Sequence, residues 1–529
     1  MAKVFNTTGT CYPQEHYMVD TTKKMKFFEG LIDRKSYFCI NRARQFGKTT
    51  TLRYLYYNLG DEYLVIPASF EVFSDNSWDT SETFSKFFCT KLINAFETKE
   101  NKYTDYQDFW SRTKSIDGID LDILSKKITE FCVLTDKKVV LLIDEVDKAA
   151  DNDIFLKFLG MLRNKYLERD VMGEHSTFWS VILAGVYDIK NLKLKLRPED
   201  ERKYNSPWNI AVNYKLDMTF NPQEISTMLV DYENDHHIGF DIMEISEEIY
   251  RYTSGYPVLV SAICKEIDEY QDKNWTKDGI LKAAKMLLND ENFTLFDDIS
   301  KNLSNYSKLH DFLYDISVNG VQYSYSLLDP ILKMAKMFSY IKSGDKGNVE
   351  IHNLLFEEAF NSYFINEFAR KSVKDPILSA SDYVKNGDLD MTLVINRFSD
   401  LMSYSYKDRD QKFLEYHGRL MFLCFIKPII NGTGFCYFES QTKNGGRMDL
   451  VVTYNHKEYI VELKIWRGEK YELSGRDQLA EYLDTRNQSE GYLVTFSFLK
   501  SKTIQAEPEW IEHNGKRIFE AVIDCVRGE

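Results

Sequence analysis

The stretch from Tyr37 to Leu59 constrains the fold of this chain more than any other. It joins an apolar run, residues 37–41, to Gly47-Lys48-Thr49, and it continues with apolar residues at helical spacing. A strand that turns through glycine into a helix is a phosphate-binding arrangement, because backbone N–H groups at a helix N-terminus attract phosphate oxygens. The stretch therefore predicts a nucleotide-binding α/β domain.

Each residue of the Gly-Lys-Thr triplet suits a different part of a nucleotide. Gly47 lets the backbone approach closely, Lys48 reaches the terminal phosphates, and the hydroxyl of Thr49 binds Mg²⁺. The triplet alone is common, and a helix start with a solvated lysine explains it equally well. Arg42 stands where such a loop normally has its first glycine, which leaves the tight turn to its neighbours.

A second segment supports the nucleotide interpretation. The apolar run Val139–Ile143 is typical of a parallel strand covered on both faces, and it ends in Asp144-Glu145. Two adjacent acids at a buried strand end are costly unless a cation or hydrogen-bond donors satisfy them. We expect Asp144 to bind Mg²⁺ and Glu145 to activate the attacking water. The alternative is a strand that runs into an acidic surface turn.

The apolar runs divide the chain into three parts. Residues 1–230 alternate strand-like runs with amphipathic helices, which predicts a parallel sheet with helices on both faces. These runs are 37–41, 63–69, 138–143 and 180–185. Residues 231–375 are mainly helical, and a hairpin near 337–352 is predicted as the wing of a winged-helix element. After a polar boundary at 371–407, residues 376–529 are predicted as a compact α/β domain.

Charged residues alternate with apolar ones near the C-terminus. Two strand-like runs, 448–453 and 458–464, flank a turn at Asn455-His456 and predict a hairpin. In its register Asp449 faces Glu462, and Lys464 projects from the same face. The cluster suits a divalent cation on the two acids, with the lysine orienting water. A surface hairpin with loosely paired charges is the alternative.

Four segments of the first part resemble the AAA-ATPase-like family of bacterial P-loop proteins. They are YFCINRARQFGKTTTL, VVLLIDEVD, SVILAGVYDIKNL and YNSPWNIA. In that family an Arg-rich stretch of the type RxRxFGKT replaces the usual first glycine. The resemblance implies that ATP binds the loop residues Arg42, Arg44, Gln45, Phe46, Gly47, Lys48, Thr49 and Thr50, with Mg²⁺ on Thr49 and Asp144.

The same resemblance assigns weaker positions. The segment SGYPVLV, which contains Pro257, is similar to the glycine-x-proline element that lies over the nucleotide in related ATPases. At the place of the first sensor the chain offers Tyr187 and Asp188 instead of the usual Asn or Thr. Arg197 and Arg202 are the nearby candidates for an arginine finger.

The C-terminal part resembles the PD-(D/E)XK nuclease superfamily. Its D-x(12)-E-x-K pattern is matched by Asp449, Glu462 and Lys464. The helix before the hairpin often supplies a further acid in that superfamily, and here it offers Glu415. The resemblance therefore implies a restriction-endonuclease-like domain with Mg²⁺, or Mn²⁺, bound by Glu415, Asp449 and Glu462.

The helix after the hairpin extends this resemblance. Ser474 is predicted as its N-cap, with Asp477 three residues on. Gln478 and Tyr482 follow on one helix face, as the superfamily's helix-borne glutamine and tyrosine do. Gln478 is accordingly a candidate catalytic residue. Local cations around this hairpin suit a nucleic-acid groove, and they are Arg447, Lys464, Arg467, Lys470 and Arg476.

These observations predict an ATP-binding and ATP-hydrolysing P-loop protein with a metal-dependent nuclease-like domain that acts on DNA. The net charge of −14 argues against non-specific coating of nucleic acid, though not against one local basic groove. The alternative is an ATP-driven switch or interaction protein whose nuclease fold only binds. No apolar run is long enough to span a bilayer, so we expect no membrane contact. The eight cysteines are scattered singly, which favours reduced thiols and a cytoplasmic location. A homo-oligomer is compatible with the AAA-ATPase-like resemblance.

Overall fold

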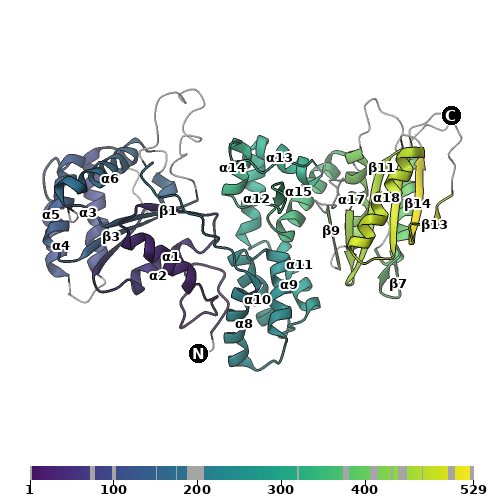
Figure 1. The fold of residues 1–529 in the computed structure, drawn as a ribbon, viewed down its shortest axis with the longest axis horizontal. Coiled ribbons are helices and arrows are strands. Elements are labelled where there is room, and N and C mark those ends of the chain that lie inside the picture. Colours follow the sequence, from purple (N-terminus) through teal and green to yellow (C-terminus); the bar gives the residue numbers. More distant parts are fainter. Residues whose placement is uncertain are drawn as a thin grey trace. The chain divides into compact units, whose positions relative to one another are not determined.

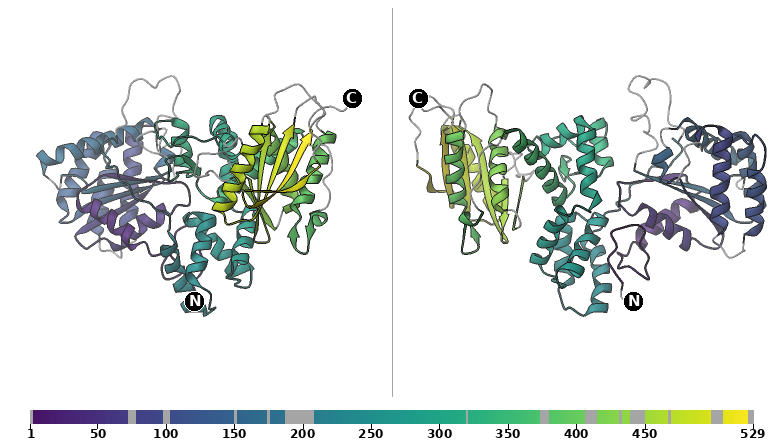
Figure 2. Two further views of the ribbon diagram at one scale, coloured as in Figure 1. Left: turned by 45° about the vertical axis from the view of Figure 1, so that its right-hand side comes forward. Right: turned by 180° about the vertical axis from the view of Figure 1, so that it is seen from behind.

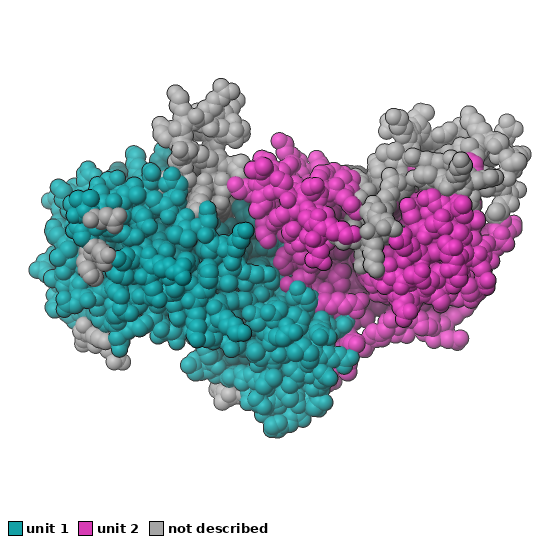
Figure 3. All heavy atoms as spheres, viewed as in Figure 1, with its two compact units in different colours: residues 1–250, 255–265, 337–339 teal, residues 251–254, 266–336, 340–529 magenta. Residues whose placement is uncertain are grey.

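The computed structural model consists of two compact units, coloured separately in Figure 3. One unit contains residues 1–250, 255–265 and 337–339, and the other contains residues 251–254, 266–336 and 340–529. The structure describes residues 3–71, 78–97, 103–149, 152–173, 176–186, 208–318, 321–372, 380–405, 415–430, 433–438, 450–466, 469–497 and 507–524.

The first unit contains a parallel sheet of four strands. Its strands are β1 (Phe38–Asn41), β2 (Tyr63–Ser69), β3 (Lys138–Asp144) and β4 (Ser180–Gly185). The helices around it are α1 (Thr22–Asp33), α2 (Lys48–Asn58), α3 (Ser81–Glu97), α4 (Thr104–Lys114), α5 (Leu121–Leu134) and α6 (Asp153–Met172). The prediction of parallel strands at these positions is confirmed.

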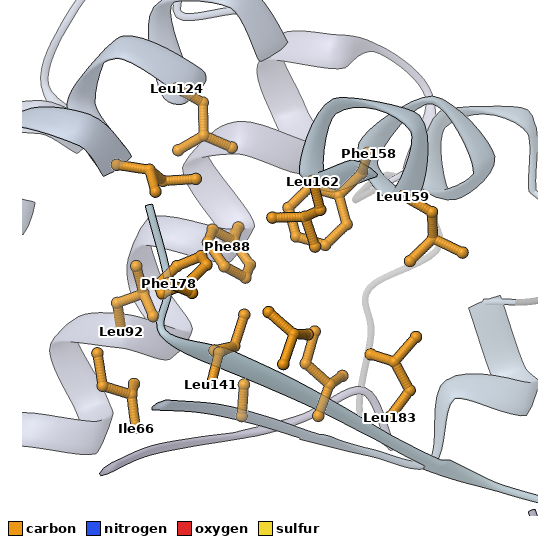
Figure 4. Close-up of a cluster of buried hydrophobic side chains, with 14 of the residues drawn as sticks. Ile66, Phe88, Leu92, Leu124, Leu141, Phe158, Leu159, Leu162, Phe178 and Leu183 are labelled. Atoms are coloured by element: carbon orange, nitrogen blue, oxygen red, sulfur yellow. The ribbon is translucent and has the colours of Figure 1, made fainter. Parts of the chain in front are cut away.

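Both faces of this sheet are covered by helices (Figure 1). Alternate strand residues, such as Ile66, Leu141 and Leu183, pack against α3 and α6 in the core drawn in Figure 4. The intervening residues point to the other face, where Phe28 of α1 stacks on Phe38 at a ring distance of 5.7 Å. Burial on both sides explains why the strands are continuously apolar.

The strand order places the nucleotide loop at the carboxyl edge of the sheet. The order is β1-β4-β3-β2, so the chain leaves β1 and crosses the sheet to reach β2 at the far side. In open α/β sheets ligands bind outside the carboxyl ends of strands at such a switch point. The loop before α2 and the acidic end of β3 both lie at this edge.

Helices follow the sheet in the sequence. α8 (Pro222–His236), α9 (Ile242–Thr253) and α10 (Pro257–Tyr270) come first, and their residues up to 250 and from 255 to 265 belong to the first unit. The next elements are α11 (Lys277–Leu288), α12 (Thr294–Asn305), α13 (Ser307–Ser317), α14 (Pro330–Met337), β5 (Ile341–Ser343), β6 (Val349–Ile351) and α15 (Leu354–Ser372). The hairpin predicted near 337–352 is confirmed as the antiparallel pair β5–β6.

The second unit ends in a mixed sheet of six strands, in the order β13-β14-β12-β11-β10-β9. The strands are β9 (Gly434–Phe438), β10 (Leu450–Tyr454), β11 (Lys457–Ile465), β12 (Glu490–Ser497), β13 (Glu509–His513) and β14 (Lys516–Asp524). Helix α18 (Glu469–Thr485) covers one face, where its Leu479 lies in one apolar cluster with Leu493 of β12 (Figure 2). Helices α16 (Met391–Ser405) and α17 (Glu415–Ile430) lie on the other, where Phe398 meets Phe496.

The hairpin register predicted from the sequence is confirmed. Leu450 pairs with Val461 and Tyr454 with Lys457. Asn455 and His456 have φ values of 47° and 63°, as a two-residue turn with the mirror-image twist requires. Asp449, one residue before β10, lies outside the described residues.

Two local predictions for this part are wrong. Residues 371–407 are no continuous polar boundary, because α16 lies within them and packs on β14. Helix α18 begins at Glu469, so Ser474 lies inside the helix and is not its N-cap. Helix α17 continues through Pro428 to Ile430, and its last turn contains buried Ile429 and Ile430. Among the described residues, no helix has the length and apolarity needed to cross a membrane.

Candidate functional site

The loop between β1 and α2 has the backbone geometry of a phosphate-binding turn. Gly47 is the N-cap of α2 with φ at 76°, and Gln45 has φ at 57°. A positive φ strains most side chains but not glycine, which explains the residue at position 47. Helix α2 then starts at Lys48 and presents its first N–H groups at the carboxyl edge of the sheet.

Lys48 lies beneath the loop, and its side chain is only 8% exposed. Its ammonium donates to the backbone carbonyls of Arg42 and Ala43, each at 3.0 Å. Burial lowers the pKa of Lys48, whereas the carboxylates of Asp147, Glu145 and Asp144 counteract that shift. The lysine is thus held by loop carbonyls and three nearby acids.

Thr49 and Asp144 are in direct contact. The hydroxyl of Thr49 donates to Asp144 Oδ2 at 2.7 Å, and the N–H of Glu145 donates to Asp144 Oδ1 at 2.9 Å. Glu145 has φ at 56°, a left-handed conformation that is uncommon for residues other than glycine. Hydroxyl and carboxylate oxygens are ligands that Mg²⁺ prefers, so these residues fit that cation.

Asp147 is a member of this cluster that sequence reasoning missed. Its Oδ2 accepts the N–H of Val186 at 2.5 Å, just beyond the end of β4. A Cβ atom at Gly185 would lie 2.6 Å from Asp147 Oδ1, so the glycine gives the carboxylate room. Asp147 is the third acid of the segment IDEVD, and this was the sequence signal that could have identified it. Its partner, the N–H of Val186, becomes evident only because β3 and β4 are neighbours in the sheet.

The two arginines of the loop are predicted to bind ATP, which stays a prediction, and in this structure both take part in contacts within the protein. The guanidinium of Arg42 donates to the carbonyls of Asn41 and Leu216, at 2.8 and 2.6 Å. It therefore fastens the loop to a distant backbone segment. The backbone carbonyl of Arg44 accepts the hydroxyl of Tyr256 at 3.0 Å.

The glycine-x-proline element lies against the loop, within the same unit. Gly255 has φ at 70°, and a Cβ there would lie 1.8 Å from the carbonyl oxygen of Phe220. Tyr256 packs edge-on against Phe46, with the ring centroids 4.7 Å apart. Pro257 follows and faces a cavity beside the loop.

That cavity has a volume of about 630 Å³ and is mostly apolar. Its wall contains the predicted loop residues Gln45, Phe46, Gly47 and Thr50, together with Pro257. The N-terminal segment supplies another wall, which sequence reasoning missed because these residues share no spacing with the loop. It includes Tyr12, Pro13, Met18 and Val19, and Tyr54 and Tyr57 of α2 line the cavity as well. A pocket of this size and polarity suits a flat nucleobase next to a phosphate-binding loop.

The second predicted site contains a buried ion pair. Glu462 and Lys464 of β11 are 1% and 6% exposed, and the lysine ammonium pairs with the Glu462 carboxylate. The ammonium also donates to Oε1 of Gln478 on α18, at 3.1 Å. Buried charges are tolerated when they are paired in this way. The structure thus brings three predicted residues of the second site together.

Other predicted residues of this site are placed differently. Arg476 forms a two-point ion pair with Glu520, at 2.5 and 2.7 Å, and Asp477 contacts His513 at 2.7 Å. Tyr482 is buried beside Gln478 on α18. Glu415 is the first residue of α17, and its side chain is not described. Asp449, Arg447, Arg467, Tyr187, Asp188, Arg197 and Arg202 lie outside the described residues, as does the side chain of Lys470.

The described part of the chain contains no cluster of three or more His, Cys, Asp or Glu side chains arranged to hold a metal ion. Of the three acids predicted to bind a cation at the second site, Glu462 has a described side chain. The pairing of Glu462 with Asp449 therefore stays a prediction.

A parallel sheet with a Gly-Lys-Thr loop after β1 and acids at the end of β3 defines a P-loop nucleotide-binding protein. Residues 14–287 match the AAA-like domain model. The chain belongs to that family. None of the curated proteins matches it.

Solved structures show distant likeness. The Walker-type ATPase PABY2304 of Pyrococcus abyssi is 13% identical with a TM-score of 0.45, over 67% of this chain and 99% of that one. The Thermotoga maritima RuvB Holliday junction branch migration motor is 13% identical with a TM-score of 0.32, over 63% and 92%. The Aeropyrum pernix ORC2 protein, in ADPNP and ADP complexes, is 9% identical with a TM-score of 0.33, over 66% and 93%.

Proposed function

We propose that this protein binds ATP together with Mg²⁺ and hydrolyses it. The observation that carries the proposal is the hydrogen bond from Thr49 to Asp144, which joins the start of α2 to the acidic end of β3. Lys48 lies near both, and the carboxylates of Asp147, Glu145 and Asp144 counteract the lowering of its pKa by burial. The adjoining cavity offers room for the base.

Each residue has a distinct task in this proposal. Lys48 exchanges the carbonyls of Arg42 and Ala43 for the terminal phosphates, and the N–H groups at the start of α2 bind phosphate oxygens. Thr49 and Asp144 hold Mg²⁺, which when bound offsets charge on the phosphates. Glu145 orients the attacking water and accepts its proton.

Two variants test this assignment. Lys48→Ala should lower ATP affinity at least about tenfold, because the charged partner of the terminal phosphates is lost. Glu145→Gln should retain binding and reduce turnover at least about a hundredfold. Lys126→Ala removes an exposed lysine on α5 and serves as the control. Parent-like hydrolysis by both site variants would refute the assignment.

For the C-terminal domain we propose metal-dependent cleavage of DNA, controlled by nucleotide at the first site. The observation in favour is the buried pair of Glu462 and Lys464 on β11, with Gln478 of α18 accepting a hydrogen bond from the lysine. With Asp449 as the second acid, the cluster would bind Mg²⁺ or Mn²⁺ through carboxylates. Lys464 would orient the water and offset charge on the phosphate.

The test is incubation of the full chain with linear and circular DNA, in Mg²⁺ or Mn²⁺, with and without ATP. Metal-dependent cutting that is lost in Lys464→Met supports cleavage. Lys457→Met is the matched control, because this exposed lysine lies on the same strand and pairs with Asp388. Equal cutting by Lys464→Met and the parent would refute the proposal.

An ATP-driven switch whose C-terminal domain only binds is the second candidate. It is favoured by the ammonium of Lys464, which Glu462 and Gln478 already engage, and by the acidity of the chain. Retention of DNA or a partner protein without cutting, in either metal, would support this candidate over the nuclease.

A further inference from the structure

Tyr256 connects the phosphate loop to the start of α10. Its side chain is fully buried, and its hydroxyl donates to the backbone carbonyl of Arg44 at 3.0 Å. Its ring also meets Phe46 edge-on at 4.7 Å. The residue therefore contacts both the backbone and a side chain of the loop, immediately before the first helical residue, Pro257.

The chain on the other side of Tyr256 is fixed in place. The N–H of Phe220 donates to the carbonyl of Gly255 at 2.9 Å, and the two backbones approach so closely that no Cβ would fit at Gly255. Phe220 in turn precedes the capping box of α8, where Lys24 binds Glu224 and the carbonyl of Thr219, each at 2.8 Å. Tyr256 thus lies between the loop on one side and this network of backbone and ion-pair contacts on the other.

The proposed ATP binding requires the contacts of the loop to change. In this structure Lys48 is bound to the carbonyls of Arg42 and Ala43. When it reaches terminal phosphates it must leave both, which frees the backbone next to Arg44. The carbonyl that Tyr256 contacts is therefore directly adjacent to the part of the loop that changes.

We infer that Tyr256 is a positioning residue that couples the ligand state of the loop to α10. Its hydroxyl and ring hold residues 257–265 against the loop, so that Pro257 and the cavity wall close on the nucleotide when Lys48 engages the phosphates. This inference rests on the proposed ATP binding. It adds a regulatory contact, made by a side chain that does not itself touch the cavity.

The experiment compares Tyr256→Phe with the parent, using the full chain. Loss of one hydrogen bond should raise the Kd for Mg-ATP about twofold to tenfold. The kcat at saturating ATP should change less than about twofold, since no reacting group is altered. AMP-PNP should slow amide hydrogen exchange at 257–265 in the parent, and this slowing should be lost in the variant.

Tyr37→Phe is the matched control. Tyr37 is also fully buried, and its hydroxyl donates to the carbonyl of Phe178 at the same 3.0 Å, but it belongs to the core. The control should bind ATP and respond to AMP-PNP as the parent does. Equal behaviour of Tyr256→Phe and Tyr37→Phe, with the parent binding ATP, would overturn the coupling alone. A parent that binds no ATP would overturn the proposed function, and the coupling with it.

Phe46→Leu provides a second measurement. It retains the hydroxyl bond of Tyr256 and removes the ring contact, so at saturating AMP-PNP the slowing of exchange at 257–265 should be partly lost. If Tyr256→Phe does not fold, Phe46→Leu alone tests the inference. Full retention of the slowing in Phe46→Leu would overturn the inference.

Discussion

Thr49 donates a hydrogen bond to Asp144 at 2.7 Å, although 95 positions separate them in the chain. The first residue belongs to the helix after β1, and the second ends β3. Parallel strands bring both residues to one edge of the sheet. The hydroxyl and the carboxylate of the proposed cation site are therefore adjacent.

Asp144→Asn should weaken the Mg²⁺ dependence of ATP binding. The amide can still accept the Thr49 hydroxyl, but it carries no charge for the cation. We expect the ratio of Kd values in EDTA and in Mg²⁺ to fall at least about tenfold, as measured by calorimetry. Asp122→Asn, an exposed carboxylate on α5, should leave the ratio unchanged. A full Mg²⁺ effect in Asp144→Asn would contradict the cation assignment.

Gly255→Ala should destabilise the first unit more than Gly239→Ala. Both glycines have positive φ, at 70° and 88°, so both substitutions carry backbone strain of about 1–2 kcal/mol. Only at Gly255 would the new Cβ collide with a backbone, at 1.8 Å from Phe220 O, whereas nothing lies within 4 Å at Gly239. Urea denaturation should show an additional loss of about 2 kcal/mol or more at Gly255. Equal losses would mean that the backbones separate easily.

Lys464→Met should be more destabilising than Glu462→Gln/Lys464→Met. The single change removes the ammonium that offsets a buried carboxylate, which typically costs about 3–5 kcal/mol. The double change also removes the carboxylate charge, so most of that loss should be recovered. Urea denaturation of both variants, with Lys457→Met as the exposed control, measures the difference. A double variant no more stable than the single one would show that the pair is not energetically coupled.

Lys285→Met should change the pH dependence of stability. Burial lowers the pKa of Lys285 to about 8, in a cluster with Glu358 and Asp278, where its ammonium lies over the ring of Phe435. Between this pKa and the ordinary value near 10.5, the unfolded chain binds more protons at this residue, so its contribution to stability rises with pH.

Below pH 8 the parent therefore buries a charged ammonium, and Met avoids that cost. The stability of Lys285→Met relative to the parent should accordingly decline as pH rises from 8 to 10. Urea titrations at pH 7, 8.5 and 10 measure the change. A difference that is constant with pH would contradict the lowered pKa.

Local sequence patterns determined the elements of this protein. The strands β1, β2, β3 and β4 could be predicted from their apolar runs, because each strand is buried on both faces. The loop before α2 could be predicted because strand, glycine and helix are contiguous. The register of the C-terminal hairpin could be predicted as well, because a two-residue turn fixes which residues are opposite each other.

Tertiary structure alone decided which side chains those elements bring together. β4 lies between β1 and β3, and this order gives Asp147 its contact with Val186. The segment after Val212, which bridges to Phe38 of β1, brings Leu216 to Arg42. The cavity wall from the N-terminal segment and the bond from Tyr256 to Arg44 likewise join residues far apart in the chain. Sequence periodicity reports which face of an element is buried, whereas the partner on that face depends on how the whole chain packs.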